Sequence, residues 1–228
     1  MKMLRTEWEK LAPMNFTERR QYIWEYYKLH IFALLVLVFM AGSLMNTLIF
    51  NPPRQDFLYF VWIGPQVSPF ELDDFAEDLN IIVENPNRYV VRAANYCIQG
   101  LDPQTAMALR TRLVAQVQMR RLDVFMLTKE ELYDLSSSGL ILPIMLFMDA
   151  LEELNPITHE IMAQRLVEIT FFYMEDEYAT TGYMAASLVD VPFFDKFDIG
   201  TDNLYLAIVI NSERFERAAR ALEVIFDV

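Results

Sequence analysis

Residues 31–50, IFALLVLVFMAGSLMNTLIF, carry no charged side chain, and only Ser43, Asn46 and Thr47 among them are clearly polar. An α-helix rises about 1.5 Å per residue, so a stretch of this length would cover about 30 Å, which is the hydrocarbon thickness of a bilayer. We therefore predict a transmembrane helix here. The predicted span divides the chain into a cytoplasmic amphipathic head at 1–30, the span at 31–50 and a C-terminal domain at 51–228.

The segment before the span, NFTERRQYIWEYYK at 15–28, predicts a helix that begins at a cap on Asn15 or Thr17 and continues into the span. Aromatic rings with a polar edge are favoured at headgroup depth, and so are basic side chains at a helix end. The residues that we expect to anchor the helix in this way are Tyr22, Trp24, Tyr26, Tyr27 and Lys28. The alternative is an aromatic recognition motif for a cytoplasmic protein.

Basic residues on the two sides of the span predict its orientation. Arg19, Arg20 and Lys28 precede it, whereas Arg54 is the only basic residue within thirty positions after it. The positive-inside bias predicts a single-pass cell-membrane protein with a cytoplasmic N-terminus and an extracytoplasmic C-terminal domain. A cleavable signal peptide is the alternative, because Ala41-Gly42-Ser43 has small residues at the required spacing. The long charged region before the span and the apolar residues after that site disfavour it.

Charge is distributed unevenly along the chain. Residues 1–50 have a net charge of +2, and residues 51–228 have 13 basic against 28 acidic side chains, a net charge of −15. A domain this acidic repels nucleic acid and anionic lipid headgroups, so we expect no nucleic-acid partner. The acidity serves either solubility or a preference for cationic partners. The single cysteine, Cys97, excludes an intrachain disulfide.

The C-terminal domain begins with strands and helices in alternation. Asp56–Gly64 is an apolar run typical of a strand buried on both faces, and Ser68-Pro69-Phe70-Glu71 is a capping box that opens a helix. The same order repeats through a strand at 88–96, a helix that starts at Asp102-Pro103, a strand at 122–128 and a helical turn from Lys129. Such alternation predicts right-handed crossovers and a parallel sheet.

The remaining elements complete an α/β fold class. We predict helices at 143–154 and 156–164, strands at 167–174, 183–189 and 204–210, and a closing helix capped by Ser212. With helices between the strands, the expected architecture is an N-terminal transmembrane helix followed by a three-layer α/β domain with a mainly parallel sheet.

Two long segments of this domain carry a family resemblance. They are RRLDVFMLTKEELYDLSSSGLILPI at 120–144 and GYMAASLVDVPFFDKFDIGTDNLYLAIVINSERFERAARALEVIF at 182–226. Together with the preceding strands and helices, this order resembles one lobe of a periplasmic-type solute-binding protein. More closely, the chain is similar to uncharacterised single-span bacterial membrane proteins with such a domain. The resemblance implies a binding module, although a full binding protein has two lobes and this chain has room for one.

Sequence signatures of catalysis are not found. The chain contains no phosphate loop, dinucleotide fingerprint, paired-cysteine metal site or Gly-x-Ser-x-Gly elbow, and its two histidines are His30 and His159. Acidic clusters occur at 73–78 and at Glu175-Asp176-Glu177, but the first alternates with a buried helix stripe and is expected to be solvated. We therefore predict no enzyme activity, no cofactor and no metal.

If a ligand binds, a parallel sheet places it at the carboxyl ends of the strands. The residues that follow from this rule are Trp62, Gly64, Asn95, Tyr96 and Thr128. The two rings would stack on a small solute, and Asn95 and Thr128 would supply hydrogen bonds. The competing interpretation makes Trp62 part of the core and Gly64-Pro65 a turn.

The expected function is that of a membrane-anchored extracytoplasmic binding or interaction module without catalysis. Its expected partners are the lipid bilayer and either a small solute or an extracytoplasmic or membrane protein. The first alternative is a structural or assembly factor that recruits a membrane protein through the head and span. The second is a hydrolase with an acidic site.

Overall fold

The computed structural model describes residues 15–50, 52–98, 100–172, 179–197 and 199–227. The chain divides into two compact units, Met1–Pro53 and Arg54–Val228. We refer to them as the N-terminal unit and the C-terminal unit. The second acidic cluster of the sequence, at 175–177, lies outside the described residues.

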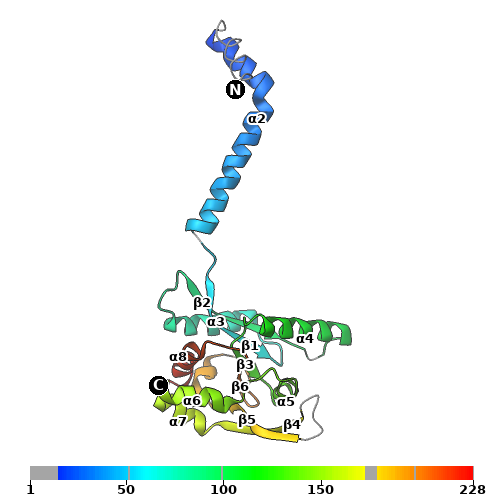
Figure 1. Cartoon of the computed structure of the whole chain (residues 1–228), viewed down its shortest axis with the longest axis vertical. Coiled ribbons are helices and arrows are strands. Elements are labelled where there is room, and N and C mark those ends of the chain that lie inside the picture. Colours follow the sequence, from blue (N-terminus) through cyan, green and yellow to red (C-terminus); the bar gives the residue numbers. More distant parts are fainter. Residues whose placement is uncertain (1–14, 51, 99, 173–178, 198, 228) are drawn as a thin grey trace. The chain divides into compact units, whose positions relative to one another are not determined.

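The described residues of the N-terminal unit form one long helix, α2 (Phe16–Met45; Figure 1), which continues into a π-helical turn, η1 (Asn46–Phe50). Asn15 caps α2 by accepting from the Phe16 N–H, and Glu18 accepts from the Asn15 N–H at 2.9 Å. This arrangement confirms the predicted cap and the continuous helix. Trp24–Phe50 is the one helical segment of the described chain that is long and apolar enough to cross a membrane.

The C-terminal unit is an α/β structure, as predicted. Its elements in chain order are β1 (Gln55–Ile63), α3 (Pro69–Leu79), η2 (Asn80–Ile82), β2 (Tyr89–Tyr96), α4 (Pro103–Gln118), β3 (Val124–Leu127), α5 (Lys129–Ser137), α6 (Ile144–Leu154), α7 (Pro156–Ala163), β4 (Leu166–Phe172), β5 (Ala179–Ser187), η3 (Pro192–Lys196), β6 (Tyr205–Ile208) and α8 (Phe215–Phe226). Pro69 and Pro103 occupy the first turns of α3 and α4, where the missing N–H has no cost.

The six strands form one mixed sheet in the order β2-β1-β3-β6-β5-β4. β1 pairs in parallel with β2 and β3, whereas the pairs β3–β6, β6–β5 and β5–β4 are antiparallel. The prediction of a mainly parallel sheet is therefore wrong for its second half. Six residues separate β4 from β5, and a parallel crossover needs a dozen or more, so these two strands can only form a hairpin.

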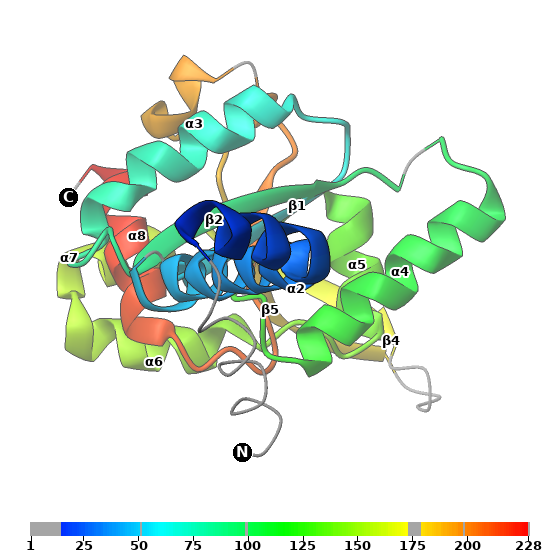
Figure 2. The ribbon, with the colours of Figure 1, turned by 90° about the horizontal axis from the view of Figure 1, so that it is seen from above.

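Helices cover both faces of the sheet and enclose two apolar cores. In β1, Phe60 and Trp62 belong to the core under α3, α6 and α8, while Val61 and Ile63 belong to the core under α4 and α5. Figure 2 shows α3 and α4 on opposite sides of the β2–β1 edge. The predicted burial of the first strand on both faces is confirmed, because seven of its nine residues alternate between the two cores or pack against them.

Candidate functional site

A cavity of about 500 Å³ lies where the parallel strands β1 and β3 end. Ile63 pairs with Leu127 as the last residues of their strands, so the segments that follow both strands leave the sheet side by side. The cavity walls come from three places in the chain, namely the β1–α3 connection, the start of α5 and the loop before β6. The lining residues are Trp62, Pro65, Gln66, Val67, Thr128, Glu130, Ile199, Gly200, Asp202, Asn203 and Leu204.

Two polar groups beside this cavity are covered and have no partner. The indole Nε1 of Trp62 and the hydroxyl of Thr128 make no hydrogen bond within the described chain. Thr128 is the N-cap residue of α5, yet its side chain accepts no bond from the first turn of that helix. Buried polar groups are nearly always paired, and leaving one unpaired costs free energy. These two groups therefore mark a place where hydrogen-bonding capacity is unused.

Gly64 explains how the Trp62 and Thr128 side chains come together. A Cβ atom built on Gly64, whose φ is +156°, would lie 2.9 Å from Cγ2 of Thr128 and 3.8 Å from Nε1 of Trp62. The first distance is shorter than carbon atoms tolerate. Only glycine lets the end of β1 pass this close to the start of α5.

Asn95 holds the wall of the cavity without lining it. Its amide Nδ2 donates to the carbonyl oxygens of Trp62 and Pro65 at 3.3 Å and 3.2 Å, and its Oδ1 accepts from the Val67 N–H at 3.4 Å. One backbone group at the end of β1 and two in the β1–α3 connection are thereby tied to β2. The sequence predicted a ligand contact for this residue, whereas the structure gives its side chain to the loop.

Tyr96 lies under the opposite face of the sheet. Asn95 pairs in register with Trp62 and Tyr96 with Ile63, and successive side chains of a strand point to opposite faces. The Tyr96 ring belongs to the core under α4, and its hydroxyl donates to Oε1 of Gln116 at 2.8 Å. Burial raises the pKa of this hydroxyl, and the nearby Arg112 guanidinium lowers it in part. Of the five predicted residues, the structure brings Trp62, Gly64 and Thr128 to one cavity edge.

The chemistry of the lining selects by charge. Glu130 and Asp202 are its only charged side chains among the described residues, and the remaining walls are apolar or carry amides and a hydroxyl. Neither carboxylate forms an ion pair within the part of the chain that the structure describes. The two negative charges therefore disfavour anions and favour neutral or cationic molecules. Half-apolar walls with a few polar groups are typical of sites for small organic ligands.

No family model, curated protein or solved structure matches this chain. Its function is therefore argued from the geometry of its own residues.

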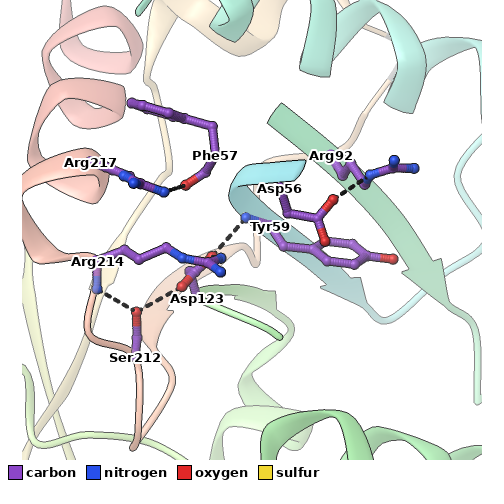
Figure 3. Close-up of polar contacts among 8 residues, drawn as sticks. All are labelled: Asp56, Phe57, Tyr59, Arg92, Asp123, Ser212, Arg214 and Arg217. Atoms are coloured by element: carbon purple, nitrogen blue, oxygen red, sulfur yellow. Dashed lines mark hydrogen bonds and ion pairs between the residues drawn. The ribbon is translucent and has the colours of Figure 1, made fainter. Parts of the chain in front are cut away.

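A second polar site, which the sequence did not predict, surrounds Asp123 at the other end of β3. Asp123 is 2% exposed, and its Oδ1 accepts from the Ser212 hydroxyl at 2.9 Å. Its Oδ2 accepts from the Tyr59 N–H at 2.9 Å and from Nη1 of Arg214 at 2.8 Å. Figure 3 shows contacts from β1 and from the segment before α8 converging on this carboxylate, which stands just before β3. The buried acid thus joins three segments that are distant in sequence.

Burial and pairing act in opposite directions on the Asp123 carboxyl. Burial raises its pKa, and the Arg214 guanidinium with the Tyr59 and Ser212 hydrogen bonds offsets part of that rise. Ser212 was predicted to cap the last helix, but Arg214 holds the N-cap position of α8. The Ser212 hydroxyl donates to Asp123 instead and accepts weakly from the Arg214 N–H at 3.4 Å.

The other candidates that lie within the described residues, His159 and the first acidic cluster, are not brought together by the structure. Within the described residues no three His, Cys, Asp or Glu side chains lie close enough to hold a metal ion. Asp78 of the first acidic cluster pairs with Lys196. His159 lies in α7 and donates its backbone N–H to Asn155 as part of that helix.

Proposed function

We propose that this protein is a membrane-anchored binding module of solute-binding-like fold whose C-terminal unit takes a small neutral or cationic molecule at the carboxyl ends of β1 and β3. The single observation that carries the proposal is the cavity of about 500 Å³ flanked by the unpaired indole N–H of Trp62 and hydroxyl of Thr128. Both groups are covered, so a ligand supplies partners to them only when the Trp62 or Thr128 side chain turns toward the cavity, and it then recovers the free energy that their burial costs. We propose binding without chemical turnover.

The membrane anchor is supported by the surface of α2 and η1. None of the most apolar 18-residue window of Trp24–Phe50 is buried. Each fully exposed Leu, Ile or Phe side chain gains about 1.5–3 kcal/mol on leaving water, so this helix strongly favours lipid. The aromatic side chains at its N-terminal part suit the headgroup region: the Tyr22 and Tyr26 rings lie 4.6 Å apart and Trp24 is well exposed. Tyr27 and Lys28 follow on the same helix, and we propose a cytoplasmic head and an extracytoplasmic C-terminal unit.

Membrane extraction and protease access test the anchor. The full chain should stay with membranes in alkaline carbonate, and protease added to intact cells should remove the C-terminal unit. A cleaved signal peptide would instead release a shortened chain from the membrane. Protection of the C-terminal unit in intact cells would contradict the proposed orientation.

Fluorescence of Trp62 tests the binding site directly. The chain has three tryptophans, so a full-length variant with Trp8→Phe and Trp24→Phe leaves Trp62 as the only indole. We would titrate it in an uncharged detergent with putrescine as a cationic probe, glucose as a neutral probe and succinate as an anionic probe. We expect a saturable change in emission with putrescine or glucose and none with succinate.

Two further outcomes decide between functions. Asp202→Asn should weaken putrescine binding and leave glucose binding unchanged, because it removes charge from the lining. If none of the three probes changes the emission, the cavity proposal fails and the assembly-factor alternative is favoured. That alternative is tested in the cell by replacing residues 1–50 with an unrelated anchor, since a function that survives the replacement resides in the C-terminal unit.

A further inference from the structure

Five arginines line a cavity of about 740 Å³ at the amino ends of β1 and β2, the edge of the sheet opposite to the Trp62 cavity. They come from four separate segments, namely the residue before β1, the β2 strand, the segment after α4, and the N-cap and first turn of α8. The arginines are Arg54, Arg92, Arg121, Arg214 and Arg217. Asp56 is the only acidic residue of the lining within the described chain.

This concentration of positive charge contrasts with the rest of the C-terminal unit. Residues 54–228 have 13 basic and 28 acidic side chains, and five of those 13 gather at this one cavity. The expectation that the acidic domain repels nucleic acid and anionic lipid headgroups was drawn from its net charge. A net charge does not describe a local surface, because screening limits each charge to about 8–10 Å at physiological salt. The arginine cavity is therefore an attractive region for anions on an otherwise repulsive unit.

Part of the cavity is held in place by contacts behind it. The Asp123 carboxylate accepts from Nη1 of Arg214, and the Phe57 carbonyl oxygen accepts from Nη1 of Arg217 at 3.0 Å, as Figure 3 shows. The Arg217 guanidinium also lies 4.7 Å from the Phe57 ring centre and 5.6 Å from that of Tyr89. A guanidinium has five N–H donors. The hydrogen bonds found for Arg214 and Arg217 each use one side-chain nitrogen, which leaves donors for a ligand.

The carboxylates present do not neutralise this cavity. Asp56 pairs with Arg92 at 2.5 Å and Asp123 pairs with Arg214 at 2.8 Å. Among the described residues, no carboxylate lies within ion-pair distance of Arg54, Arg121 or Arg217. Placing like charges together without counterions is unfavourable. Three guanidinium groups without a carboxylate partner in the described chain therefore lie at one cavity. Such an arrangement is expected where a bound anion supplies the missing negative charge.

We propose that the arginine cavity binds a phosphate ester, with Arg217, Arg121 and Arg54 as its main contacts. Each guanidinium group presents paired N–H donors whose spacing matches that of phosphate oxygens. A phosphate group has more oxygens than a carboxylate and can therefore pair with several guanidinium groups at once. The cavity is larger than a phosphate group alone requires, and the Tyr59 and Tyr89 side chains in its lining suit the organic part of an ester. Long polyanions such as nucleic acids are excluded by the surrounding negative charge.

The same chemistry occurs in soluble phosphate esters and in anionic phospholipid headgroups. Arg54 follows Phe50, the last residue of η1, by four positions. An extended chain spans at most about 3.6 Å per residue, so the proposed anchor would keep Arg54 within about 14 Å of the helix end. This part of the inference rests on the proposed membrane anchor, whereas phosphate binding itself does not.

Soluble probes separate these sources. We would titrate the full chain in dodecyl maltoside by calorimetry with glycerol 3-phosphate, with dihexanoyl phosphatidic acid and with zwitterionic dihexanoyl phosphatidylcholine. Binding of both phosphate monoesters with similar affinity indicates a site for soluble esters. Binding of the phosphatidic acid alone indicates a lipid headgroup site. If neither binds, or if phosphatidylcholine binds as well as they do, the proposal is overturned.

Matched variants locate the site. Arg121→Gln should weaken binding about tenfold or more through loss of a charge-assisted contact, and Arg217→Gln should do the same. Arg120→Gln is the control, because Arg120 neighbours Arg121 in sequence but pairs with Glu213 and does not line the cavity. Both Arg120 and Arg121 are exposed, so folding is not at stake. If the control Arg120→Gln weakened binding as much as Arg121→Gln does, the attraction would be unspecific and the proposed site would be refuted. Thr128→Val should leave phosphate binding unchanged, which keeps this test independent of the Trp62 cavity.

Discussion

Replacement of Thr128 by valine should stabilise the protein, although threonine is a good helix N-cap. A threonine that caps a helix contributes about 1 kcal/mol, and its loss normally destabilises by that amount. The Thr128 side chain makes no capping bond to α5, and its hydroxyl is covered and unpaired within the described chain. Valine has nearly the same shape and removes the unpaired group. The sign of the change therefore distinguishes a capping hydroxyl from an unused one.

The magnitude follows from the cost of the covered hydroxyl. An unpaired buried donor or acceptor costs about 1–3 kcal/mol. The φ of −74° and ψ of 164° at Thr128 suit a β-branched residue, so valine adds no backbone strain. We expect the free energy of unfolding to rise by about 1 kcal/mol. For a unit of this size that change corresponds to an increase in Tm of about 2–4 °C.

The assay is thermal unfolding of the full chain in uncharged detergent, followed by near-ultraviolet circular dichroism of the aromatic side chains. Thr158→Val is the matched control, because Thr158 is 0% exposed and its hydroxyl also lacks a partner in the described chain, but it lies in α7 outside the cavity. Both variants should raise Tm. Only Thr128→Val should weaken the response of Trp62 to putrescine or glucose.

A fall in Tm in Thr128→Val would contradict this prediction. A Tm that falls by 2–4 °C in Thr128→Val would show that the hydroxyl caps α5 in solution and is not available to a ligand. A gain in Tm with unchanged probe binding would keep the stability argument and refute the role of Thr128 in the site.

Four further outcomes are expected. Gly64→Ala should destabilise the protein by about 1–3 kcal/mol in chemical unfolding, since the new Cβ would meet Cγ2 of Thr128 at 2.9 Å. Adding Thr128→Ser, which removes that methyl group, should restore part of the lost stability, and no restoration would refute the contact. Asn95→Ala should lower Tm and reduce putrescine or glucose binding together, because it frees three backbone groups of the cavity wall, and an unchanged Tm would contradict this. Burial raises the pKa of Asp123 in the folded state above its ordinary value of 3.8. The pH-dependent part of its contribution to stability is therefore full below that value and is lost as pH rises through the folded pKa, while its hydrogen bonds and ion pair contribute separately. Asp123→Asn should flatten this part of a pH titration of stability, and an unchanged profile would assign the dependence to other groups. Asp123→Ala should lower the free energy of unfolding by about 2–4 kcal/mol. This is somewhat less than for a fully buried ion pair, because the Arg214 side chain is 29% exposed. A loss below about 1 kcal/mol in urea unfolding would show that the ion pair does not stabilise the fold.

Local sequence was enough to predict most elements of the first half of the C-terminal unit. Pro69 and Pro103 begin helices after Ser68 and Asp102, and Asp102 accepts from the Gln104 and Thr105 N–H groups at 3.1 Å as a helix cap should. Such signals act over three or four residues and do not depend on the rest of the fold. The same holds for Asn15 and α2.

Pairing between distant strands was not predictable from the same signals. The alternation of strand and helix fits β2, β1 and β3, but it does not say that β6 inserts next to β3 in the antiparallel sense. The short connection between β4 and β5 was a usable signal, because it is too short for a crossover. No comparable local signal identifies the neighbour of a strand.

The candidate sites also contain some residues that local sequence predicts and others that only the tertiary structure brings together. Trp62 and Thr128 could be proposed from sequence because Trp62 lies near the end of β1 and Thr128 follows β3, and the ends of parallel strands meet at one edge. The loop at 199–204, which closes the same cavity, comes from a part of the chain whose position only the sheet order defines. The arginine cavity draws on segments as far apart in sequence as Arg54 and Arg217, and Arg217 also donates to the Phe57 carbonyl oxygen, 160 positions away.

The sequence by itself determined the apolar helix, its caps, the acidic composition of the C-terminal unit and the helices and strands that precede position 138, because each depends on neighbouring residues or on simple counts. The tertiary structure alone decided the antiparallel insertion of β6 beside β3, the unpaired state of the Thr128 hydroxyl within the described chain and the gathering of five arginines on an acidic unit. These features arise from contacts between residues far apart in the chain. Their free energies depend on which segments meet when the two cores close, and that is set by the packing of the whole unit.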